Sequence, residues 1–106
     1  MNRWAALQRY PVVISFVVRF PGVEVLRSAL RHGIPGEDIR HAIDNAVAVD
    51  EVADDPVRWL VLGADQAGNL LELVVMDRPA GPAVIHAMPM RAAYRWLLPK
   101  GRREQA

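Results

Sequence analysis

The sequence predicts one α+β domain with an antiparallel sheet of three to five strands, packed by two helices from the N-terminal half and one C-terminal helix. Three observations lead to this fold class. Apolar segments at 58–63, 70–76 and 83–88 are separated by loops short enough for hairpins, which predicts a three-stranded antiparallel meander. Helix-period apolar patterns precede and follow these segments. The 106 residues, 52% of them hydrophobic, suffice for one core but not for a second domain.

Residues 1–22 are predicted to be an N-terminal extension, and the domain then spans 23–106. The β-branched run at 10–18 fits a strand and is about half as long as a membrane-spanning helix needs to be. Arg19 follows this run at once and no small-x-small cleavage site comes after it, so the segment does not match a signal peptide.

Two helices are expected before the sheet. Residues 23–26 form a short predicted strand that leads into the first helix, and Gly33 stands where a left-handed C-terminal glycine belongs. The apolar face of this helix would hold Leu26, Ala29 and Leu30. Pro35 and the carboxylates after it open the second helix, where the helix dipole favours negative charge. Apolar residues then recur at helical spacing and are Ile39, Ala42, Ile43, Ala46 and Val47.

From residue 50 onward, the sequence predicts a connector, then strands joined by turns, and a last helix. Residues 50–55 are acidic and are followed by Pro56, which predicts a connector. Turn-forming residues fill 64–69 and 78–82 between the strands. Pro89 suits the first turn of the C-terminal helix. The apolar stripe of that helix would be Met90, Ala93, Tyr94 and Leu97.

The charge is unevenly distributed along the chain. Residues 1–36 carry five arginines against Glu24, for a net charge of +4. Residues 37–77 carry ten carboxylates against two arginines, for −8, and residues 78–106 carry six basic groups against Glu104, for +5. Such asymmetry bears on partners more than on fold, and it predicts a basic surface near the C-terminus beside an acidic central region.

Composition and motifs exclude several classes of chemistry. The chain has no cysteine, which rules out disulfides, thiolate zinc sites and cysteine nucleophiles, and which fits a cytoplasmic protein. The three histidines lack metal-ligand spacing, and no P-loop, dinucleotide or HExxH motif occurs. We therefore expect neither a metal nor a cofactor.

Three short motifs between residues 23 and 99 carry a resemblance to a known family. They are Arg-His-Gly-Ile at 31–34 with Glu-Asp-Ile at 37–39, the strand pair 58–63 and 68–75, and Val-Ile-His-Ala at 84–87 before a basic segment. The first resembles the (Lys/Arg)-His-Gly-(Val/Ile) helix junction of the BrnT-type toxins, and the others resemble their central hairpin and last strand. One departure is Met88-Pro89-Met90, because BrnT-type proteins usually carry arginines there.

The resemblance implies a RelE-like fold, within the RelE/ParE-like toxin superfamily, and a role as the toxin of a bacterial type II toxin–antitoxin pair. Toxins of this family cut mRNA without a metal ion, and a DNA-binding antitoxin encoded beside them neutralises them. The expected partners are therefore a cognate antitoxin and RNA, without a membrane. For the oligomeric state, a homodimer is one alternative.

Metal-free RNA cleavage defines what the candidate residues would do. It needs a base at the ribose 2′-hydroxyl, an acid at the leaving 5′ oxygen and cations on the phosphate. His86 suits acid or base chemistry near neutral pH, and Tyr94 suits proton donation or base stacking. Arg91 and Arg95 lie four residues apart, on one face of the expected helix, and would hold the phosphate. The predicted RNA-binding residues are Arg58 and Lys100.

Each of these residues also has a purely structural explanation. A strand histidine is often only hydrogen-bonded, Tyr94 on its apolar stripe fits the core, and arginines solubilise helix faces. His32 fits a helix C-terminus and His41 the polar face of the second helix. The alternative function is therefore a non-catalytic interaction domain of the same fold that binds a partner protein through its basic face. Only the enzyme hypothesis predicts that His86 and the arginines converge.

Overall fold

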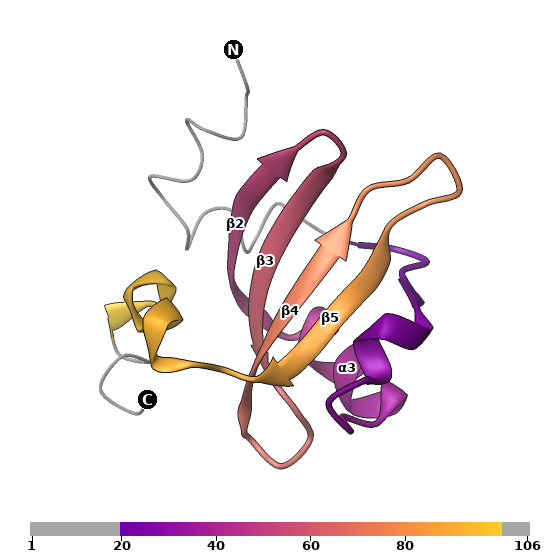
Figure 1. The fold of residues 1–106 in the computed structure, drawn as a ribbon. Helices are drawn as coiled ribbons and strands as arrows, with labels where there is room; N and C mark the ends of the chain where they lie inside the picture. Colours follow the sequence, from indigo (N-terminus) through magenta and orange to yellow (C-terminus); the bar gives the residue numbers. More distant parts are fainter. Residues whose placement is uncertain (1–19, 101–106) are drawn as a thin grey trace.

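A five-stranded sheet forms the centre of the structure, a computed structural model that describes residues 20–100 (Figure 1). In chain order the elements are β1 (Glu24–Val25), the 3₁₀ turn η1 (Arg27–Leu30), helix α3 (Gly36–Asp44), β2 (Ala46–Asp54), β3 (Val57–Ala64), β4 (Leu70–Met76), β5 (Ala83–Pro89) and the 3₁₀ segment η2 (Ala92–Leu97). The predicted α+β class is confirmed. The strand predicted at 10–18 and the tail after residue 100 lie outside the described residues.

The strands lie in the order β1-β5-β4-β3-β2. β3, β4 and β5 pair in antiparallel fashion, which confirms the predicted meander. β2 is antiparallel to β3, whereas β1 is parallel to β5, with Glu24 beside Ala83. The sheet as a whole is therefore mixed and not antiparallel. The parallel pair arises because the chain returns to β1 only after a long crossover through α3 and the meander.

Strand β2 corrects two predictions from the sequence. The helix ends at Asp44, so Ala46 and Val47 belong to β2 and not to the helix. The predicted acidic connector at 50–55 is mostly the second half of this strand. Because β2 is an edge of the sheet, its carboxylates can reach solvent, and an acidic sequence is compatible with a strand there.

One face of the sheet, the helix face, is covered by η1 and α3. Strand residues alternate between faces, and alternate residues of β3, β4 and β5 point toward α3. Ile39, Ala42 and Ile43 of α3 are buried against them, as predicted. The sheet and loop residues of this core are Val23, Ala29, Val49, Trp59, Val61, Leu71, Leu73, Val75, Val84 and Ala87. The fold is held mainly by this layer, since apolar burial is the dominant favourable term.

The opposite face, which we call the second face, carries Leu60 and Leu62 of β3. The segment η2 covers it over β2 and β3, where Leu97 and Leu98 are buried against these leucines. Figure 1 shows the extended stretch that carries the chain from the end of β5 to η2. Over β4 and β5 the second face is only partly covered, and Val74, Met76, His86 and Met88 are half-buried. This half of the second face is where polar side chains gather.

The predicted first and last helices are short 3₁₀ segments. In η1, Ala29 is buried as expected, but Leu30 is 45% exposed because a single turn presents too few residues for a continuous apolar face. Pro89 ends β5 instead of opening a helix, and Arg91 has extended backbone angles. Arg91 and Arg95 therefore do not share one helix face. Among the described helices, none is long and apolar enough to cross a membrane.

Replacing Ile43 with alanine is expected to lower the free energy of unfolding by about 2–5 kcal/mol, because Ile43 is buried under α3 and truncation leaves a cavity. His41→Ala should cost about 1 kcal/mol, since His41 is half-buried and its Nδ1 lies 3.0 Å from the Ala64 carbonyl oxygen, instead of pointing into solvent as expected. Urea unfolding measures both values. Equal losses would contradict the packing of α3.

Candidate functional site

A buried carboxylate organises the half-covered part of the second face. Glu72 of β4 pairs with Leu62 of β3 and Met88 of β5, so its side chain points away from α3. The side chain is 1% exposed. A buried charge is costly unless it is paired and hydrogen-bonded. The partners of Glu72 are therefore central to what this site does.

Arg91 is the main partner of Glu72. Its backbone N–H and its Nε–H both donate to Oε1, each at a distance of 2.9 Å. Its Nη2 donates to Oε2 at 2.6 Å. This is the bidentate geometry in which a planar guanidinium matches a carboxylate best. The extended backbone at Arg91, where the chain leaves β5, lets the main chain and the side chain reach the same carboxylate.

His86 is the second partner. It lies on β5, beside Val74, and its Nε2 is 3.1 Å from Oε2 of Glu72. The side chain of His86 is 27% exposed, so the ring is bonded to Glu72 and still reaches solvent in part. Glu72 thus ties together two of the predicted catalytic residues, His86 and Arg91, from a strand and from the segment that follows it.

Two further rings complete the cluster. The guanidinium carbon of Arg91 lies 5.5 Å from the centroid of the Tyr94 ring, within the range of a cation–π contact. The ring of His32, in the loop between η1 and α3, lies 5.5 Å from that of His86 at an interplanar angle of 77°. We call the group of His32, Glu72, His86, Arg91 and Tyr94 the Glu72 cluster.

The Glu72 cluster keeps its central carboxylate ionised. Burial alone raises the pKa of Glu72, but hydrogen bonds from Arg91 and His86, with the charge of Arg91, outweigh it and hold the pKa below its usual value. The same pair raises the pKa of Arg91 further, mainly through the hydrogen bond to Glu72. The cluster therefore contains a fixed ion pair next to two imidazoles and a phenol.

The lowered pKa of Glu72 predicts how stability depends on pH. The ionised Glu72 should contribute its full stabilisation above the pKa it has in the unfolded chain, and that contribution should disappear as pH falls through the lower pKa of the folded state. Urea unfolding of wild type and Glu72→Gln at a series of pH values measures it. The wild-type advantage should shrink only on acidification, and an advantage that is independent of pH would contradict the ion pair.

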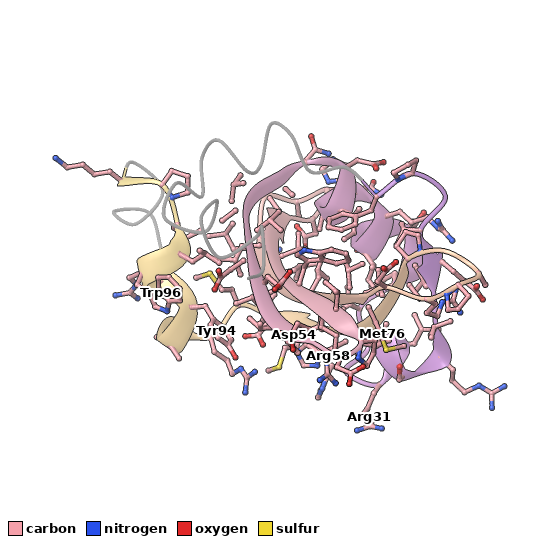
Figure 2. The ribbon with its side chains drawn as sticks, turned by 90° about the horizontal axis from the view of Figure 1, so that it is seen from above. Arg31, Asp54, Arg58, Met76, Tyr94 and Trp96 are labelled. Carbon is pink, nitrogen blue, oxygen red and sulfur yellow. The ribbon has the colours of Figure 1, made fainter. Side chains whose placement is uncertain are left out.

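The other predicted site residues are not part of the Glu72 cluster. Arg58 lies on the second face, paired with Met76 and two strands from His86, and Figure 2 shows it beside Met76 and apart from Tyr94. Its side chain makes no hydrogen bond or ion pair within the described residues, although the residue is half-buried. Arg95 is exposed on η2, and Lys100 is exposed after it. The predicted set is thus brought together only in part.

Tyr94 belongs both to the apolar cluster of the second face and to the Glu72 cluster. It is half-buried and packs against the apolar cluster beneath η2, as its apolar stripe predicts. It also stands under the guanidinium of Arg91. Trp96, two residues later, is 58% exposed. Figure 2 shows both aromatic side chains on the same C-terminal segment, with Tyr94 nearer to the sheet.

Neither Glu72 nor a role of His32 in the site is predicted from the sequence. A carboxylate in the middle of the apolar run Leu-Leu-Glu-Leu-Val-Val is itself a signal, because a strand with both faces covered rarely holds an unpaired charge. His32 lies 54 residues before His86, and only the pairing of β5 with the edge strand β1, next to η1, brings them together. No periodicity within the sequence marks such a contact.

In the part of the chain that the structure describes, no group of three or more His, Asp or Glu side chains is placed to hold a metal ion. Comparisons with models of protein families, with curated proteins and with solved structures found no match to this chain. The Glu72 cluster is therefore the basis on which a function is proposed.

Proposed function

We propose that this protein is the toxin of a bacterial toxin–antitoxin pair, with a RelE-like arrangement of sheet and helices, and that it cleaves mRNA without a metal ion. The observation that carries the proposal is the convergence of His86 and Arg91 on Glu72, with Tyr94 beside them. These residues come from β4, β5, the segment before η2 and η2 itself. Convergence of a proton-transfer group and a cation is what cleavage at the 2′-hydroxyl requires.

Each residue has a defined task in this mechanism. Because Glu72 receives the Nε2 proton of His86, the Nδ1 atom of the neutral ring has a lone pair for the 2′-hydroxyl proton. Glu72 uses two donors of the Arg91 side chain, and Nη1 has no hydrogen bond within the described residues, so it is free for a phosphate oxygen. The ring of Tyr94 lies under the guanidinium of Arg91 and adds a phenol to the Glu72 cluster.

The distribution of charge favours binding of RNA near the Glu72 cluster, away from the β2 edge of the sheet. Strand β2, at one edge of the sheet, carries Asp50, Glu51 and Asp54, which would repel a polyanion. Toward the opposite edge, Arg27 and Arg31 are exposed next to the loop of His32. Phosphate contacts by arginine dominate the affinity of proteins for nucleic acids. An RNA strand would therefore approach from the side of β5.

The decisive experiment is to induce the protein in a bacterium and to incubate the purified protein with single-stranded RNA. We expect growth arrest, and RNA cleavage that persists in EDTA, because the mechanism uses no metal. A short reading frame beside the gene should encode a DNA-binding antitoxin whose product relieves the arrest. Normal growth together with intact RNA would contradict the proposal.

A non-catalytic interaction domain is the second candidate. One observation favours it: the backbone N–H, the Nε–H and one Nη2–H of Arg91 all bind Glu72, so the residue has a structural task that needs no substrate. In that case the basic surface would only bind a partner protein. Growth arrest that is unaffected by His86→Ala, without detectable RNA cleavage, would favour this second function.

A further inference from the structure

His32 is the one member of the Glu72 cluster with no task in the mechanism above. It is exposed, and it lies in the loop that joins η1 to α3, directly after Arg31. Its ring meets the ring of His86 nearly at right angles, with the centroids 5.5 Å apart. An exposed imidazole needs no partner for its own stability, so its position next to a second imidazole at the site calls for an explanation.

The hydrogen bonds of His86 distinguish the two rings. Glu72 is ionised, because its pKa is lowered by Arg91 and His86, and an ionised carboxylate only accepts hydrogen bonds. Nε2 of His86 must therefore carry a proton, and Nδ1 is the atom that is free to take one up. Among the described residues, the charged and titratable groups placed against His86 are Glu72 from β4 and His32 from its loop. Arg91 lies close by, because its Nη2 donates to Oε2 of Glu72, the same oxygen that Nε2 of His86 contacts.

We propose that His32 is a second catalytic residue: it is the general acid that protonates the leaving 5′ oxygen, while His86 is the general base. This inference rests on the proposed ribonuclease activity. Two imidazoles whose rings are 5.5 Å apart can each lie within hydrogen-bond reach, about 3 Å, of a different oxygen on one phosphorus atom. The exposure of His32 allows it to exchange protons with solvent between turnovers.

The resulting step balances without water or a co-reactant. Nδ1 of His86 takes the proton from the ribose 2′-hydroxyl, and the 2′ oxygen forms a bond to phosphorus. The bond between phosphorus and the 5′ oxygen breaks, and that oxygen takes a proton from the protonated His32. The products are a 2′,3′-cyclic phosphate and a free 5′-hydroxyl, and both histidines have exchanged their protonation states. Nη1 of Arg91 stabilises the negative charge on the phosphate.

A substrate that needs no acid tests the role of His32. The probe is a short single-stranded RNA in which sulfur replaces the bridging 5′ oxygen at one linkage, since a thiolate leaves without being protonated. On the oxygen substrate, His32→Ala should be slower than wild type by about 10²-fold or more. On the sulfur substrate, His32→Ala should cleave at close to the wild-type rate, whereas His86→Ala should be slow on both substrates.

Matched variants separate this role from a structural one. His32→Gln keeps a polar side chain and should behave like His32→Ala, and urea unfolding of both should resemble wild type because the side chain is exposed. His41→Ala, a histidine bonded to Ala64 outside the cluster, should change neither rate. Equal losses on both substrates, or no loss at all, would overturn the proposal. A wild-type protein that cleaves neither substrate would contradict the ribonuclease activity itself.

Discussion

A Gly63→Ala protein is expected to be less stable than wild type by about 3 kcal/mol, the upper part of the usual range for overpacked cores. Gly63 lies on β3 under α3, and a Cβ atom there would lie 2.9 Å from the carbonyl carbon and 3.3 Å from the Cα of Ala42, with the Ala42 carbonyl oxygen closer still. These are backbone atoms of a helix that Ile39 and Ile43 anchor in the core. They cannot move aside as a flexible side chain would.

The control for this substitution is Gly36→Ala at the start of α3. Nothing lies within 4 Å of the position that a Cβ would take at Gly36, and its φ is not positive. Its unfolding free energy should therefore equal that of wild type or exceed it by up to about 1 kcal/mol, through a less flexible unfolded chain. Urea unfolding of the two variants compares them directly. A Gly63→Ala protein as stable as Gly36→Ala would show that α3 does not pack so closely on β3.

A His86→Ala protein is expected to cleave RNA about 10²–10⁴-fold more slowly than wild type, which is the usual contribution of one proton-transfer group. Because a protonated imidazole has no lone pair, wild-type cleavage by a general base should also decline on acidification. The ion pair of Glu72 and Arg91 should be lost only at a lower pH than an ordinary glutamate would allow, since the pKa of Glu72 is lowered. The rate of RNA cleavage as a function of pH measures both effects.

A second variant serves as the control for His86→Ala. Arg78→Ala removes a cation that pairs with Glu24 and lies outside the Glu72 cluster, so it should leave cleavage unchanged. A decline toward alkaline pH alone would make His86 the acid instead of the base. A His86→Ala protein with the wild-type rate at every pH would remove His86 from the mechanism.

Much of the fold could be predicted from local patterns. The three strands of the meander were found within a residue or two, because alternation with turn residues between the runs is a strong local signal. The sequence also predicts helix α3, but the predicted helix continues past Asp44, where α3 ends. Ala46 and Val47 satisfy a helical spacing and a strand equally well, and only pairing with β3 decides between them.

The candidate site was predictable in its residue types but not in its organisation. His86, Arg91 and Tyr94 lie close together in the sequence, so a cluster near the end of β5 could be inferred. Arg91 and Arg95 were expected on one helix, yet the extended backbone at Arg91 separates them. Short apolar stretches form 3₁₀ turns or α-helices according to tertiary contacts, which a periodic pattern cannot resolve.

The sequence by itself determined the α+β class, the antiparallel meander, the apolar face of α3 and the position of His86 on the last strand. These properties depend on residues that are neighbours along the chain or that repeat with a fixed period. The tertiary structure alone decided that β5 returns to pair with β1 and that β2 forms an edge. It also decided that Glu72, Arg91, His86 and His32 meet, because a buried carboxylate acquires its partners only from segments that the folded sheet brings side by side.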